Sequence, residues 1–319
     1  MGKNTVRVVA DDGLAIAVHR WETEFAPRGV ILISHGMGEY AMRYDRFAEA
    51  ATRAGFSVWA SDHRGHGETA GSLSRLGHLA DRKGFSRVVE DFRLVAQEAR
   101  RLHPSAPFFV LGHSFGSLVA LSFIERYGDD IAGCVLVGTI GPRPFASRAG
   151  IALAGIVSAF RGKRRPSPFL QRVTFGSYNR RVVAPASPNS WLSRDAAEVE
   201  RYDSTPWSGF VSTAGFFRDL SRGLRDVHRP RAIARIPKDL PIFVASGGDD
   251  PVGRYGEGPT RLVRSLIKGG AAKASLRVYR LARHELVNEL NRDEITSDLI
   301  AWIDARTRER APNGPQAGA

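Results

Sequence analysis

A serine stands between two glycines at residues 112–116, which read Gly-His-Ser-Phe-Gly. Four apolar residues, Phe108 to Leu111, come before this segment and predict a buried strand, and residues 117–121 predict the start of a helix. Ser114 is therefore expected on a sharp strand-to-helix turn that lifts its side chain clear of the sheet. The two flanking glycines leave room for the chains that pass close to such a turn. This pattern predicts a serine nucleophile.

A serine hydroxyl becomes nucleophilic when a positioned base takes its proton and a carboxylate orients that base. The segment SGGDDPVG supplies Asp249 and Asp250, and the later segment ARHELVNE supplies His284. Each segment follows a predicted strand, and active sites of parallel sheets form at the carboxyl ends of the strands. The order of these groups predicts a catalytic triad of Ser114, His284 and an aspartate. By this reasoning alone, either aspartate can be the third member.

Attack by a serine on an ester produces an oxyanion that needs two preorganised donors. The backbone N–H of Phe115, the residue after the nucleophile, is one predicted donor. The second is the N–H of Met37 in the loop SHGMGEY, which follows the predicted strand at 29–34 and also contains Gly36. The other histidines are expected to have structural or surface roles: His19, His35, His63, His66, His78, His103, His113 and His228. The spacing His-Arg-Gly-His lacks a third ligand nearby, so no metal site is predicted.

The elements that must hold these groups alternate along the chain. Strand patterns occur at residues 5–10, 14–20, 29–34, 56–61, 108–112, 131–139, 240–248 and 275–281. Helical spacing of apolar residues occurs at 43–55, 85–102, 257–268 and 293–306. This alternation predicts the α/β class, with a mostly parallel eight-stranded sheet and helices on both faces.

The alternation is interrupted between residues 141 and 236, where prolines are frequent and the helical patterns are short. We therefore expect a core formed by 1–140 and 237–310, with 141–236 inserted as a helical cap. The remaining residues, 311–319, have the composition of a disordered tail.

Composition and charge limit the class of protein. The chain has 319 residues, of which 43% are apolar and 25% are charged, and this is typical of globular proteins. Two early aspartates stand where a signal peptide would be apolar, and the single cysteine, Cys134, lies in an apolar run. A soluble, cytoplasmic protein is therefore expected. The net charge is +13, but the basic residues are interleaved with acids and no nucleic-acid motif is present, so no nucleic-acid partner is expected.

Taken together, the motifs resemble the α/β-hydrolase superfamily and, within it, the group of monoacylglycerol lipases and bacterial lysophospholipases. The resemblance covers residues 5 to 306 and rests on HGMGEYAMRYDRFA, DHRGHGET, GHSFG, FGSYNR, WLSRDAAEV, GFVSTAGFFRDL, SGGDDPVG and ARHELVNELNRDE. It implies that Ser114 is the nucleophile, His284 the base and Asp250 the orienting acid. Asp250 is preferred to Asp249 because the family's acid stands three residues after a glycine at the strand end. The resemblance also implies that the N–H groups of Met37 and Phe115 are the oxyanion donors and that DHRGHG is a structural turn. It implies no metal or other cofactor.

The resemblance also implies that the cap supplies a pocket for an acyl chain. The predicted substrate contacts are Gly36, Phe175, Trp191, Phe210 and Phe216, although any one of these aromatic residues could instead belong to the cap's own core. The expected activity is hydrolysis of a monoacylglycerol or lysophospholipid through an acyl-enzyme. The alternatives are a short-chain esterase, a thioesterase, an aminopeptidase of the same fold and a non-catalytic lipid-binding relative.

One segment of the predicted cap, residues 149–165, contains IALAGIVSAF followed by RGKRR. Apolar residues next to a cluster of cations are typical of segments that lie on anionic membrane surfaces. This predicts peripheral contact with the inner face of a membrane. A buried cap helix followed by a solvated basic turn fits the same residues equally well.

Overall fold

A computed structural model describes residues 2–310 and shows one eight-stranded sheet with strand order β1-β2-β4-β3-β5-β6-β7-β8. The strands are β1 (Gly2–Val9), β2 (Ala15–Glu22), β3 (Gly29–Ser34), β4 (Phe56–Ser61), β5 (Phe108–His113), β6 (Gly133–Val137), β7 (Ile242–Gly247) and β8 (Ala274–Tyr279). Only β2 runs antiparallel to its neighbours, and the other adjacent pairs are parallel. The predicted α/β class and the mostly parallel eight-stranded sheet are confirmed.

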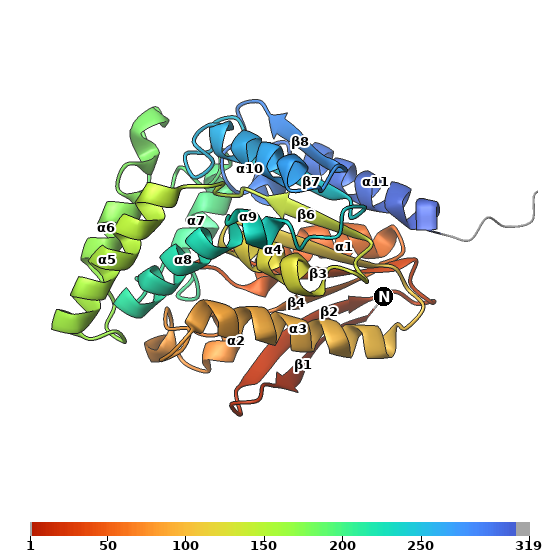
Figure 1. The fold of residues 1–319 in the computed structure, drawn as a ribbon, viewed down its shortest axis with the longest axis horizontal. Coiled ribbons are helices and arrows are strands. Elements are labelled where there is room, and N and C mark those ends of the chain that lie inside the picture. Colours follow the sequence, from red (N-terminus) through yellow and green to blue (C-terminus); the bar gives the residue numbers. More distant parts are fainter. Residues whose placement is uncertain (1, 311–319) are drawn as a thin grey trace, which may run out of the picture.

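Helices cover both faces of this sheet (Figure 1). One face carries α3 (Gly84–Leu102), α4 (Phe115–Tyr127) and α10 (Glu257–Lys268), and the other carries α1 (Asp45–Arg53) and α11 (Arg292–Arg310). Along β3, Val30 and Leu32 pack into the first layer, whereas Ile31 and Ile33 pack into the second. Because a strand covered on both faces is apolar at every position, GVILIS and FFVL appear in the sequence as unbroken apolar runs.

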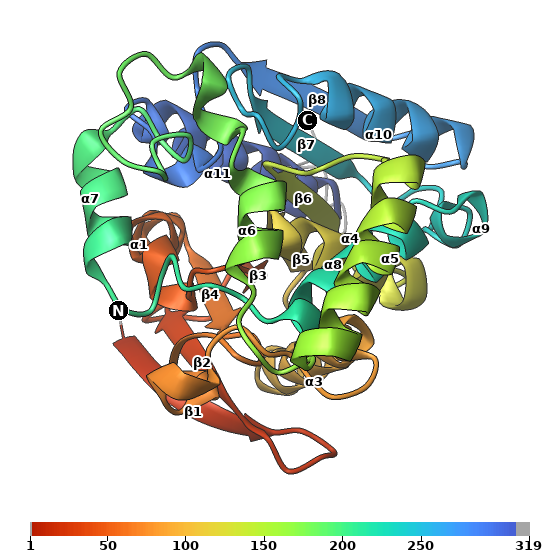
Figure 2. The ribbon, with the colours of Figure 1, turned by 90° about the vertical axis from the view of Figure 1, so that its left-hand side faces the viewer.

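The chain between β6 and β7 forms a group of helices next to the carboxyl ends of the parallel strands (Figures 1 and 2). They are α5 (Pro144–Arg161), α6 (Pro168–Phe175), η3 (Tyr178–Arg181), α7 (Ala196–Ser204), α8 (Ala214–Val227) and α9 (Pro230–Ile233). The expectation of short helices in this region is wrong for α5, with 18 residues, and for α8, with 14. The sequence offered a helix within 149–165 but not its full length, because both faces of α5 are apolar and no one-sided pattern marks its ends.

The division of the chain into a core and a cap at 141–236 stays a prediction. Within that range α8 packs against α3, α4 and α5, so it contributes to the same apolar core as the sheet. Short helices complete the fold: η1 (Ala41–Tyr44), α2 (Gly67–Ala70), η2 (Leu73–Arg75) and η4 (Leu286–Asn288). The predicted disordered tail, 311–319, lies outside the described residues.

Two glycines allow β3, β5 and α4 to approach closely. A Cβ atom added to Gly116 would lie 2.0 Å from the carbonyl oxygen of Ser34, at the end of β3. A Cβ atom added to Gly112 would lie 2.4 Å from the carbonyl oxygen of Gly116 and 2.7 Å from Cβ of Ala120. Backbone atoms cannot withdraw from such contacts without moving a whole element. The predicted role of both glycines at the turn therefore has a direct steric basis.

We predict that Gly116→Ala destabilises the protein by about 3 kcal/mol, because its methyl group collides with the backbone of β3. The matched control is Gly155→Ala in α5, where an added Cβ has no neighbour within 4 Å. That change should raise stability by about 0.5–1 kcal/mol through helix propensity. Equilibrium unfolding in urea measures both variants, and a wild-type midpoint for Gly116→Ala would contradict the close packing.

Candidate active site

The structure places Ser114 between β5 and α4 with φ 52° and ψ −116°. A positive φ is unusual for a residue with a side chain and costs backbone energy, so neighbouring contacts must maintain it. The Ser114 N–H donates to the carbonyl of Val137 in β6 at 2.9 Å, and the Ser117 hydroxyl donates to the Ser114 carbonyl at 2.6 Å. The side chain is half-buried, as expected for a residue lifted out of the sheet.

His284 lies in the loop after β8, and Asp250 lies in the loop after β7. The Nδ1 atom of His284 is 3.1 Å from each carboxylate oxygen of Asp250. Asp250 is fully buried and also accepts a 2.8 Å hydrogen bond from the N–H of Val252. With Nδ1–H donated to the carboxylate, Nε2 of the neutral ring is left as a proton acceptor. Asp249 is exposed, so the structure brings Asp250, and not Asp249, to the histidine.

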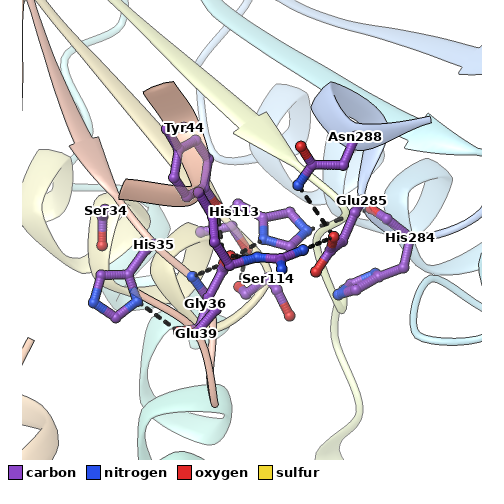
Figure 3. A network of polar contacts seen from close by, with 12 residues as sticks. Ser34, His35, Gly36, Glu39, Tyr44, His113, Ser114, His284, Glu285 and Asn288 are labelled. Carbon is purple, nitrogen blue, oxygen red and sulfur yellow. Dashed lines mark hydrogen bonds and ion pairs between the residues drawn. The ribbon is translucent and has the colours of Figure 1, made fainter. Parts of the chain in front are cut away.

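Ser114 and His284 line the same cavity of about 750 Å³, part of which is open to solvent (Figure 3). Among the described residues, no hydrogen bond joins the Ser114 hydroxyl to the ring of His284. Hydrogen bonds between catalytic groups are often long before substrate binds and shorten in the complex. The two groups therefore share one cavity, and a direct hydrogen bond between them is expected in the complex with substrate.

Most of the other predicted site residues line this cavity as well: Gly36, Met37, Phe115, Phe175, Trp191 and Phe210. Phe115 is the first residue of α4, so its N–H has no acceptor within the helix. Phe216 differs from the prediction, since it is fully buried and does not line the cavity. Its ring packs 5.2 Å from that of Phe115, because α8 turns Phe216 toward the core.

The segment DHRGHG supports the loop that carries Met37. Asp62 accepts hydrogen bonds from the N–H groups of Ala41, at 2.8 Å, and Glu68, at 2.7 Å. Nε2 of His66 accepts one from the N–H of Gly38 at 3.3 Å. Burial and the neighbouring charge of Asp62 act in opposite directions on His66, and burial dominates, lowering its pKa to about 4. A neutral ring is required here, because a protonated nitrogen cannot accept from Gly38.

Aromatic residues from the segment between β6 and β7 close one side of the site. The ring of Trp191 lies 5.1 Å from that of His284, and Phe175 stacks on Trp191 at 5.9 Å. The main chain next to Trp191 is joined to the histidine loop, because the N–H of Glu285 donates to the carbonyl of Leu192 at 2.8 Å. The aromatic wall and the loop that carries His284 are therefore joined through their main chains.

Sequence reasoning missed several polar residues of the cavity, among them Glu39, His113, Asn189, Tyr202 and Glu285. Two of them are adjacent in sequence to predicted catalytic residues, and this was a usable signal. His113 was expected to be an ordinary structural histidine. In the structure it is buried in a network with Glu39 (Figure 3).

Comparisons with known proteins agree with this geometry. The sequence profile of the serine aminopeptidase S33 family matches residues 26–291. A monoacylglycerol lipase of Mycolicibacterium smegmatis is 30% identical over 294 residues, which cover 91% of this chain and 93% of the relative. Phospholipase YtpA of Bacillus subtilis is 31% identical over 298 residues, covering 89% of this chain and 98% of the relative. The crystal structure of a thermostable carboxyl esterase from Bacillus coagulans, in complex with glycerol, has a TM-score of 0.89 at 25% identity and covers 96% of this chain and 99% of that one.

The two neighbouring aspartates allow a matched test. Asp250→Ala should slow labelling of Ser114 by a fluorophosphonate at least about 100-fold, because the histidine loses its orienting carboxylate. Asp249→Ala should label within about threefold of the wild-type rate, since this exposed side chain does not contact His284. The rate of covalent labelling is followed by intact-protein mass spectrometry. Equal rates for the two variants would show that Asp250 does not orient the base.

Proposed function

The chain belongs to the serine aminopeptidase S33 family, and from this premise we propose that it is a serine ester hydrolase that cleaves monoacylglycerols or lysophospholipids. The observation that carries this proposal is the position of Ser114, on a strained turn at an apolar cavity that also contains His284 paired with Asp250. The relatives named above, a monoacylglycerol lipase and a phospholipase, support a lipid ester as the class of substrate.

In the proposed reaction, Ser114 attacks the ester carbonyl while Nε2 of His284 accepts its proton. Asp250 holds the ring and stabilises the imidazolium that forms. The N–H groups of Met37 and Phe115 donate to the oxyanion. His284 then returns the proton to the leaving alcohol oxygen, and the acyl group stays on Ser114. A water molecule, deprotonated by the same histidine, releases the fatty acid and restores the hydroxyl.

The lining of the cavity fits an acyl chain with an uncharged carbonyl at one end. Its apolar members are Met37, Phe115, Ile140, Phe175, Trp191, Leu192, Phe210, Leu220 and Val252. Phe175 and Trp191 come from the segment 141–236, which in this proposal covers the site as a cap. Buried apolar contact contributes about 0.8 kcal/mol per methylene, so such a wall favours long chains over short ones.

An aminopeptidase of the same family must bind a positively charged amino group, and an unpaired carboxylate is the natural partner for it. Among the described residues that line the cavity, the acidic ones are Glu39 and Glu285. The guanidinium of Arg43 bonds to both of them. Because both carboxylates already have a cationic partner, the cavity favours an uncharged substrate over an ammonium group.

We predict that kcat/KM rises about fourfold for each methylene added to the acyl chain until the cavity is filled. The test is a panel of monoacylglycerols and lysophospholipids together with p-nitrophenyl acetate and butyrate, short-chain thioesters and aminoacyl amides. Ser114→Ala serves as the inactive control and should also abolish fluorophosphonate labelling. A preference for acetyl or aminoacyl substrates would overturn the lipid assignment, and unlabelled wild-type protein would favour the non-catalytic relative.

We further propose that α5 and α6 dock on an anionic membrane surface. None of the described helices is long and apolar enough to cross a membrane. The inner side of α5 packs on α8, yet its outer side is also apolar, with Phe145 82%, Ile156 57% and Phe160 87% exposed. Phe169 and Val173 of α6 extend this docking face. Exposed cations flank it: Arg148, Arg161, Arg165 and Arg172. This exposure favours an interfacial segment over a buried cap helix.

We expect the double variant Phe145→Ser/Phe160→Ser to lower the affinity for vesicles containing phosphatidylglycerol at least about tenfold, through loss of inserted apolar area. Phe25→Ser is the matched control, because this phenylalanine is 81% exposed in the loop between β2 and β3. Flotation with and without anionic lipid measures binding. Absence of wild-type binding, or equal losses in both variants, would remove the docking proposal.

A further inference from the structure

We infer that Glu39 holds His113 as an imidazolium at neutral pH and that, through its hydrogen bond to the His284 carbonyl, His113 positions the catalytic histidine. His113 is the last residue of β5 and immediately precedes Ser114, and its ring lies in a buried polar network (Figure 3). It is only 4% exposed. The consequence for catalysis rests on the function proposed above, whereas the charge on the ring does not.

The hydrogen-bond partners of the ring require two protons. Nδ1 lies 3.0 Å from Oε1 of Glu39, and Nε2 lies 3.3 Å from the carbonyl oxygen of His284. Both partners are acceptors. A neutral ring has one donor nitrogen and one acceptor nitrogen, so it would leave one lone pair facing an oxygen. Only the doubly protonated ring satisfies both contacts.

The other hydrogen-bond partners of Glu39 keep its carboxyl group ionised. Its Oε1 atom also accepts from the N–H of Gly36 and from the hydroxyl of Tyr44, at 2.9 Å, and its Oε2 atom accepts from Nε of Arg43 at 3.2 Å. Every one of these partners is a donor. The carboxylate therefore cannot carry the proton that the two contacts of His113 demand, and the proton belongs to the ring.

Charge balance leads to the same conclusion. The network contains two carboxylates, Glu39 and Glu285, and one guanidinium, Arg43, all with side chains at most 4% exposed. These three alone would leave one uncompensated negative charge away from water, which is costly. A protonated His113 makes the buried network neutral. Burial alone lowers the pKa of His113, but the hydrogen bond to Glu39 and the charges of Glu39 and Glu285 outweigh it, so that the net shift is upward.

The groups that face His113 come from every element packed against it. The loop after β3 contributes His35 and Glu39, and η1 contributes Arg43 and Tyr44. The loop after β8 contributes His284 and Glu285. Two further groups lie one contact away: Tyr202 of α7 stacks on Arg43, and Asp250 pairs with His284. The pKa of His35 is lowered well below normal by burial and by His63 and His66, so His35 adds no positive charge. The two glutamates thus dominate the field at His113.

One cation then joins the three segments that carry the reacting groups. His113 is adjacent to Ser114, bonds through Glu39 to the loop with Met37, and bonds directly to the main chain of His284. Loss of the second ring proton would release the His284 carbonyl. His113 is therefore a positioning residue, and its removal should act on kcat more than on KM.

The charge state is tested on the unmodified protein by ¹⁵N NMR of histidine rings labelled at both nitrogens. We expect the His113 ring to remain doubly protonated at pH 8, well above the ordinary histidine midpoint of about 6.5. His113→Gln identifies the signal by its disappearance. A neutral His113 ring at pH 7 would overturn the inference whether or not the protein hydrolyses any ester.

The positioning role is tested by pH-rate profiles. The cation is present below its raised pKa and is lost as the pH rises, so wild-type kcat should fall on the alkaline side. His113→Gln should lower kcat by about 10- to 100-fold, with KM within about threefold, and should abolish this alkaline limb. Glu39→Gln should move the limb to lower pH. His103→Gln, a partly exposed histidine paired with Glu22, is the control and should match wild type.

A double variant separates positioning from misfolding. Glu39→Gln/His113→Gln removes one charge of each sign, so the buried network stays neutral and its melting temperature should exceed that of His113→Gln. If the double variant is no more stable than His113→Gln, the charge-balance argument fails. If His113→Gln keeps the wild-type kcat and alkaline limb, the positioning role fails even where NMR shows the cation.

Discussion

The approach of α4 to the ends of β3 and β5 is the constraint on which the rest of the site depends. Backbone atoms fill the places where side chains of Gly112 and Gly116 would stand. Because of this contact, the chain must turn from β5 into α4 at a single residue, and Ser114 adopts the strained positive φ of that turn. The strain is maintained by packing from both sides and by hydrogen bonds from Ser114 to Val137 of β6 and from Ser117 of α4 to Ser114, so the hydroxyl is presented at a fixed place. The other catalytic groups lie on separate loops that extend toward the Ser114 hydroxyl.

Parallel topology makes this possible. Because β3, β5, β6, β7 and β8 run in the same direction, the loops that follow them meet at one edge of the sheet. Asp250, His284 and the loop with Met37 come from positions far apart in the chain, yet they lie around one cavity or directly behind it. The polar network around Glu39, at the wall of the cavity, joins the loops after β3 and β8 a second time. The positions of the loops that carry the catalytic groups are therefore fixed both by the sheet and by the buried charged network.

The parts that the sequence predicted were those with a local physical signature. Strands covered on both faces read as apolar runs, and the turn at Ser114 needs glycines at fixed offsets, so both were visible from residue types alone. The choice between Asp249 and Asp250 was not local, since it depends on which carboxylate faces inward from the loop after β7, and it was made by resemblance. Phe216 was misplaced because an aromatic residue in an amphipathic helix gives no sign of which neighbour its buried face will meet. The role of His113 was invisible for a related reason, since its partners, Glu39 and the carbonyl of His284, lie 74 and 171 positions away.

The helices between β6 and β7 combine two kinds of contact that serve different purposes. Near Trp191, the chain is joined to the histidine loop by directed polar bonds: Arg283 donates to the carbonyls of Ser190 and Ser193, and the Ser193 hydroxyl donates to the carbonyl of Asn288. Such bonds have fixed geometry, so this part moves with the catalytic histidine. The inner side of α5 instead contacts α6 and α8 through apolar side chains, including Phe175 and Phe217, and apolar contact has no directional preference. The two parts of this segment are therefore held by different forces: directed polar bonds fix the wall beside His284, whereas apolar burial holds α5 against α6 and α8.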